Sequence, residues 1–109
     1  MTVDAMVSKL GLRPLCLPDP DRTVGGVYIG DLLSWVMGRA RADDAWITIM
    51  SNMNVAAVAS LTDVSAVLLA EGVTLPDDVL AVAKDKGINV LSTELSAYEA
   101  AVLLHSALK

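Results

Sequence analysis

Apolar residues near the start of the chain recur at helical spacing. Over residues 3–10 they occupy positions i, i+3, i+4 and i+7, which is the pattern of an amphipathic helix. Thr2 has the side chain of a helix N-cap, and Gly11 can end a helix in a left-handed conformation. These signals predict a short helix that ends at Gly11.

Two further segments show the same period. Residues 29–37 place apolar side chains on one helical face, and Gly38 is the expected stop of that helix. Asn54 precedes a second apolar stretch over 55–61 and has the side chain of an N-cap. Both segments are therefore predicted to be helical.

Three short runs are mostly apolar, and only 66–70 is apolar at every position, as in strands that are buried on both faces. These runs cover residues 46–50, 66–70 and 88–91. Leu15–Leu17 and Val27–Ile29 are candidates for two shorter strands. Because strands alternate with helices, the pattern predicts an α/β fold, a single small domain over 1–109 with a mostly parallel sheet and helices on both faces.

The last third of the chain has clear helix-end signals. Pro76 and Gly87 bound one predicted helix, and Ser96 with Glu99 forms a capping box for another over 97–108. The 97–108 helix has almost no polar side, and a helix that is apolar all round is usually buried all round. We therefore expect its outer side to meet a second copy of the chain, although exposed alanines would explain the same composition.

Composition and charge exclude several classes of protein. Hydrophobic residues make up 54% of the 109 positions, which excludes intrinsic disorder. Thirteen acidic against eight basic residues give a net charge of −5, which argues against nucleic acid as a partner. A small anion still has four candidate arginines, which are Arg13, Arg22, Arg39 and Arg41.

The longest uncharged segment, 45–62, is interrupted by polar residues at Ser51, Asn52 and Asn54, so it does not have the pattern of a membrane helix. The first ten residues lack the basic and then apolar regions of a signal peptide. The lone Cys16 has no second cysteine to pair with. We expect a cytoplasmic protein with no membrane partner.

Catalytic signatures are missing from the sequence. It contains no Walker phosphate loop, no Gly-x-Gly-x-x-Gly and no Gly-x-Ser-x-Gly. One histidine and one cysteine cannot supply a metal site, so neither a metal nor a cofactor is expected. His105 is predicted to be a packed or interface residue, and Cys16 a small buried hydrophobe. We therefore predict that the chain is not an enzyme.

Two polar loops remain as candidate ligand-binding sites. The first runs from Asp21 through Arg22 and Thr23 to Gly25 and Gly26. A guanidinium beside glycines, which allow close approach to the backbone, can bind an anion. Equally, the carboxylate and hydroxyl can serve only to bond the turn's own backbone.

The second loop, Ser51 to Asn54, follows the predicted strand at 46–50 and begins a helix. Ligands of open α/β sheets bind at the carboxyl ends of strands, and free amides at a helix N-terminus attract anions. Thr48, Ser51 and Asn54 are the candidate ligand-binding residues here. The alternative is plain capping of the helix by Asn54.

Several segments resemble the DRTGG domain family, and the likeness runs from the first polar loop to about residue 96. They are DRTVGG at 21–26, VYIGDLLS at 27–34, VMG at 36–38, WITI at 46–49 and NVAAVASL at 54–61. Two departures stand out. Val24 is inserted before the two glycines, and Asn52 and Met53 stand where hydrogenase-associated relatives carry a His before the Asn.

The resemblance implies an α/β module that regulates or dimerises. A domain of this family is similar to the N-terminal domain of HPr serine kinase/phosphorylase, and this chain resembles the short members that are associated with iron-only hydrogenases. In some pyrophosphatases such a domain lies within a region that senses adenine nucleotides.

Taken together, these observations predict a non-enzymatic regulatory or small-ligand-binding module that works as a homodimer through the 97–108 helix. Its ligand would be an adenine nucleotide or another anion, and its setting hydrogenase or fermentative redox metabolism. The alternative is a structural partner protein that docks on a hydrogenase or its maturation machinery without binding a small molecule.

Overall fold

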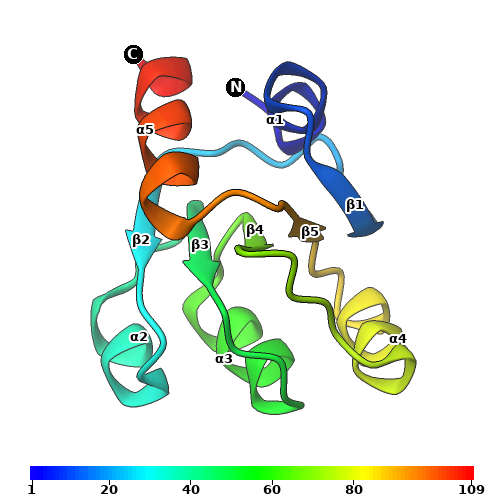
Figure 1. Ribbon diagram of the computed structural model, residues 1–109. Coiled ribbons are helices and arrows are strands. Elements are labelled where there is room, and N and C mark those ends of the chain that lie inside the picture. The colour runs from blue at the N-terminus through cyan, green and yellow to red at the C-terminus, as the bar shows by residue number, and fades with distance from the viewer.

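The computed structural model describes all 109 residues, which form one five-stranded sheet covered by five helices (Figure 1). The strands are β1 (Arg13–Cys16), β2 (Gly26–Ile29), β3 (Asp44–Thr48), β4 (Ala66–Leu69) and β5 (Val90–Ser92). The helices are α1 (Val3–Leu10), α2 (Leu33–Arg39), α3 (Asn54–Thr62), α4 (Asp77–Asp85) and α5 (Ala97–Leu108).

The sheet order is β1-β5-β4-β3-β2, with β2 to β5 parallel and β1 antiparallel at the edge beside β5. The crossover helices α2, α3 and α4 all cover one face, and α1 and α5 cover the other (Figure 1). The predicted mostly parallel sheet with helices on both faces is therefore confirmed.

Burial on both faces explains the continuous apolar runs. Every residue of β3 and β4 is buried. In β3, Trp46 packs into the layer of α2, α3 and α4, whereas Ala45 and Ile47 pack into the layer of α1 and α5. A strand with a packed layer on each side has no position for an exposed polar side chain.

The helix-end signals are confirmed at three helices. The Ala5 N–H donates to Thr2 Oγ1 at 3.1 Å, and Gly11 ends α1 with a φ of 64°. Both bonds of the capping box between Ser96 and Glu99 are present at the start of α5. Gly87, with a φ of 74°, follows α4 as expected.

Other boundaries differ from the prediction. α2 begins at Leu33 rather than at residue 29 and continues through Gly38, because β2 extends to Ile29 and a loop follows it. Asn54 is the first residue of α3 and not its cap. The carbonyl oxygen of the Asn52 side chain instead accepts the N–H of Asn54 at 3.0 Å.

Two predicted strands are also displaced. β1 covers Arg13–Cys16 and pairs antiparallel with β5, although the sequence favoured a strand at 15–17. β3 begins at Asp44 and ends at Thr48, so Ile49 and Met50 already belong to the following loop.

Candidate functional site

Arg22, the cation of the first polar loop, is bound by two carboxylates at the amino edge of the parallel sheet. Its Nε donates to Asp43 Oδ1 at 2.9 Å, and its Nη2 lies 3.0 Å from Asp63 Oδ1. Nη2 also donates to the main-chain oxygen of Asp63 at 2.7 Å. Asp43 and Asp63 both have positive φ values, so the guanidinium holds together two tight turns before β3 and β4.

The charge of Arg22 is balanced within the chain. Burial alone would lower the pKa of the guanidinium, but the hydrogen bonds and negative charges of Asp43 and Asp63 outweigh it and raise the pKa. An external anion at Arg22 would have to compete with two carboxylates that are already in place. The geometry is that of a structural ion pair, and no bound ligand is needed to account for it.

The other residues of this loop connect it to the start of the chain. Thr23 forms an isolated antiparallel bridge with Thr2, and the N–H of Val24 donates to the main-chain oxygen of Met1 at 2.9 Å. Val24 is only 3% exposed and packs in the core beneath α1 and α5. The inserted valine is therefore a core residue, while Asp21 is exposed.

Of the two glycines of the loop, Gly26 has a steric role. A Cβ on Gly26 would lie 2.7 Å from Asp44 Oδ1, so the absence of a side chain lets this buried carboxylate pack against β2. Gly25 and Gly26 also line a hollow of about 470 Å³ together with Arg39 and Arg41. The predicted binding role of the glycines stays a prediction.

The second polar loop lies at the opposite, carboxyl edge of the sheet. Thr48 is 2% exposed, and its hydroxyl donates to Asp31 Oδ1 at 2.7 Å. The main-chain N–H of Ile49 donates to the same oxygen at 2.9 Å. Ser51 and Asn54 are exposed, and none of the hollows in the structure is lined by them.

The two predicted loops are thus not brought together, because one precedes β2 and the other follows β3 in parallel strands. If they bind ligands, they do so at separate sites. Asp31, from the loop after β2, accepts the hydrogen bonds from Thr48 and Ile49 and so holds the loops after β2 and β3 together.

Cys16 and His105, neither of which was expected to be catalytic, have different surroundings. Cys16 is only half-buried, not buried as predicted. Its thiol donates to the main-chain oxygen of Ile88 at 3.3 Å, and partial burial raises its pKa, so its reactive thiolate form is disfavoured. His105 is exposed on α5 and not packed, which corrects half of its prediction. No group of three or more His, Cys, Asp or Glu side chains is arranged to hold a metal.

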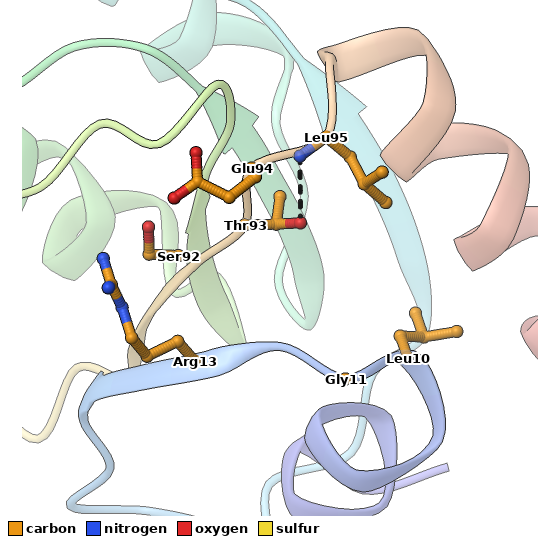
Figure 2. Close-up of a pocket in the computed structure, with 7 residues that line it drawn as sticks. All are labelled: Leu10, Gly11, Arg13, Ser92, Thr93, Glu94 and Leu95. Carbon is orange, nitrogen blue, oxygen red and sulfur yellow. Dashed lines mark hydrogen bonds between the residues drawn. The ribbon is translucent and has the colours of Figure 1, made fainter.

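Sequence reasoning missed a hollow of about 360 Å³ at the carboxyl end of β5 (Figure 2). Its lining comes from the α1–β1 turn and the β5–α5 loop, and consists of Leu10, Gly11, Arg13, Ser92, Thr93, Glu94 and Leu95. Arg13 was one of four arginines considered for an anion, but Glu94 had no signal. Only the pairing of β1 with β5 brings them to one place, since Arg13 stands opposite Ser92.

The fold and these sites define a small α/β domain. Its most distinctive polar motif, the loop from Asp21 to Gly26, uses its arginine to bind two turns of the same chain. The chain belongs to the DRTGG domain family, which matches residues 17–107. No curated protein matches it. No helix in the structure combines the length and the apolar character needed to cross a membrane.

Among solved structures, the chain is similar to the regulatory region of Clostridium perfringens pyrophosphatase, which contains CBS and DRTGG domains and was crystallised with its activator, diadenosine tetraphosphate. The TM-score is 0.74 at 16% sequence identity, a likeness that shows the fold. The match covers 94% of this chain but 45% of the other, so the chain spans less than half of that regulatory region.

Proposed function

We propose that this chain is a non-enzymatic regulatory module that works as a homodimer and responds to a small anionic ligand. The observation that carries the proposal is the outer side of α5. Ala100 and Leu104 are buried against the sheet, whereas Tyr98, Val102 and Leu103 are 77%, 47% and 40% exposed.

These exposed side chains form one patch, because positions i and i+4 lie on the same side of a helix. Together with Leu95 and Glu99 they line a shallow hollow of about 390 Å³. Clustered apolar side chains on a surface mark interaction sites, and a two-fold axis would let the same patch cover itself. The 97–108 helix would then bury its outer side, as its apolar composition favours.

The ligand half of the proposal is supported by the family and by the similar pyrophosphatase region, which is complexed with a dinucleotide activator. We extend to this chain only the class of ligand, a nucleotide or another small anion. Calorimetric titration with ATP, AMP, diadenosine tetraphosphate and acetyl phosphate tests this half, and the absence of heat from all four would contradict it.

Sedimentation equilibrium tests the homodimer. We expect the wild-type chain to sediment as a dimer and Val102→Asp as a monomer, because the substitution places a charge in the centre of the patch. Leu61→Asp is the matched control, since Leu61 is 72% exposed on α3, on the opposite face. A monomeric wild type, or equal loss in both variants, would contradict the homodimer.

The hydrogenase setting implied by the family resemblance belongs to the same proposal. It predicts that the tagged dimer retains a hydrogenase subunit or maturation protein from native extract. If the monomeric Val102→Asp chain retained such a protein and the dimer did not, the result would favour the alternative function, a partner protein that docks as a monomer.

A further inference from the structure

The hollow between the α1–β1 turn and the β5–α5 loop lies at the carboxyl edge of the sheet, next to the place where open α/β sheets usually bind ligands. After β4 the chain turns to α4 on one face of the sheet, and after β5 it turns to α5 on the other (Figure 1). Neighbouring strands whose loops leave toward opposite faces create a crevice at their carboxyl ends. The hollow of about 360 Å³ is beside this point, on the β1 side of β5.

Opposite charges face this hollow without neutralising each other. Arg13 and Glu94 are both exposed, and neither forms an ion pair, since Arg22 is the only basic side chain that does. Figure 2 shows the Arg13 guanidinium and the Glu94 carboxylate on the same side of the loop, with the Ser92 side chain between them. The arrangement offers one cation and one anion, separated, to a single ligand.

Two of the lining side chains are apolar, and hydrogen bonds hold the β5–α5 loop, which carries one of them, in place. Leu10 and Leu95 lie on the other side of the hollow (Figure 2). The N–H of Gly72 donates to Thr93 O at 2.8 Å, and the N–H of Leu95 donates to Thr93 Oγ1 at 3.2 Å. A preformed loop loses little conformational freedom when a ligand binds.

The Glu94 carboxylate is further placed by the loop after β4. Its Oε2 lies 2.5 Å from where a Cβ on Gly72 would be, so it rests on the bare backbone of that glycine. Gly72 has a φ of 74°, a conformation that favours glycine on its own account. The carboxylate, although exposed, therefore lies against the β4–α4 loop at the edge of the hollow.

We propose that this hollow binds a small molecule that carries both an anionic group, phosphate or carboxylate, and a nitrogen donor. Arg13 binds the anionic group as a charge-assisted hydrogen-bond donor, and Glu94 accepts the N–H of the ligand. The apolar body of the ligand lies against Leu10 and Leu95. The inference deepens the ligand half of the proposed function and rests on it.

Titration of the ¹⁵N-labelled full chain, followed by amide chemical shifts, tests this site. The probes are AMP, with a phosphate and an exocyclic amine, L-leucine, with a carboxylate and an ammonium group, and inorganic phosphate, which carries an anion alone. We expect AMP or L-leucine to shift the amides of Gly11 and of residues 92–95. Arg13→Ala should weaken that ligand about tenfold, and Glu94→Gln should weaken it by a similar factor while leaving phosphate binding unreduced.

Arg41→Ala and Asp85→Asn are the matched controls, because both residues are exposed and lie outside this hollow. Shifts confined to other residues, a loss of affinity in Arg41→Ala but not in Arg13→Ala, or no shift with either probe would overturn the proposal. Phosphate binding as tightly as AMP and L-leucine, with no effect of Glu94→Gln, would also overturn it. Sedimentation of the same samples shows separately whether the dimer holds.

Discussion

The two edges of the sheet treat their charges in opposite ways. At the amino edge, Arg22 is enclosed by Asp43 and Asp63, and its hydrogen bonds join two turns and the loop before β2. At the carboxyl edge, Arg13 and Glu94 lie beside one hollow and neither forms an ion pair. The first arrangement is complete within the chain, whereas the second leaves two charged groups available.

The difference separates a conspicuous motif from a candidate binding site. The loop from Asp21 to Gly26 is the most distinctive polar segment of the sequence, yet its cation already has two anionic partners. Removing one member of a partly buried ion pair leaves an uncompensated charge, so the amino edge depends on all three side chains for its structure. A ligand gains most from a charged group that has no partner within the chain, because no existing ion pair has to be broken for it to bind.

The largest expected effect comes from breaking the amino edge. Arg22→Ala leaves Asp43 and Asp63 close together without a cation and removes the bond to Asp63 O. The Arg22 side chain is 24% exposed and the two carboxylates are more exposed, so water screens part of the loss. We expect a decrease of about 2 kcal/mol in the free energy of unfolding, measured with urea.

Arg13→Ala is the control for that measurement. Its side chain is exposed and has no ion pair, so the free energy of unfolding should change by less than about 0.5 kcal/mol. Equal decreases in the free energy of unfolding for Arg22→Ala and Arg13→Ala would contradict the difference between the paired arginine at the amino edge and the unpaired one at the carboxyl edge.

Substitutions at two glycines, Gly26 and Gly38, are expected to have smaller effects on stability and to differ in sign. In Gly26→Ala the new Cβ meets Asp44 Oδ1, while Asp44 Oδ2 accepts the N–H of Arg41 at 2.8 Å and resists movement. We expect a loss of about 1 kcal/mol by the same urea measurement, at the lower end for overpacking because one side of the carboxylate borders a hollow.

Gly38→Ala should have the opposite sign. Gly38 lies within α2, and a Cβ there has no atom within 4 Å. Alanine restricts the unfolded chain and favours the helix, so a gain of roughly 0.5–1 kcal/mol is expected. A loss of stability in Gly38→Ala would contradict the helical conformation and open surroundings of Gly38 in α2.

The sequence predicts those parts of the fold that depend on local patterns. The capping box at Ser96, the left-handed end at Gly11 and the buried runs of β3 and β4 each carry their own signal. The start of α2 does not, because Ile29 suits a helix face and a strand equally. Its assignment to β2 depends on pairing with Ile47, a contact that no local pattern reveals.

The candidate sites were harder to predict for the same reason. Residue types marked Arg22 as a cation beside glycines, but its partners Asp43 and Asp63 lie in turns 21 and 41 residues away. Arg13 and Glu94 are separated by most of the chain and meet only because β1 pairs antiparallel with β5. Charge pairing at a sheet edge is a property of topology, so spacing along the sequence could not supply it.

The smallest effect concerns a neutral group near the amino edge. Cys16 stands opposite Val90 at the start of β5, and burial raises the pKa of its thiol above the ordinary value, although a backbone hydrogen bond and Lys84 act against this. Since the folded state holds the proton more tightly than the unfolded chain, the associated stability is complete below the unfolded pKa and is lost as pH rises through the folded pKa. Urea denaturation at several pH values above 8 should therefore show a decline that is shallower in Cys16→Ala, and identical slopes in the two chains would contradict a half-buried thiol that the fold keeps neutral.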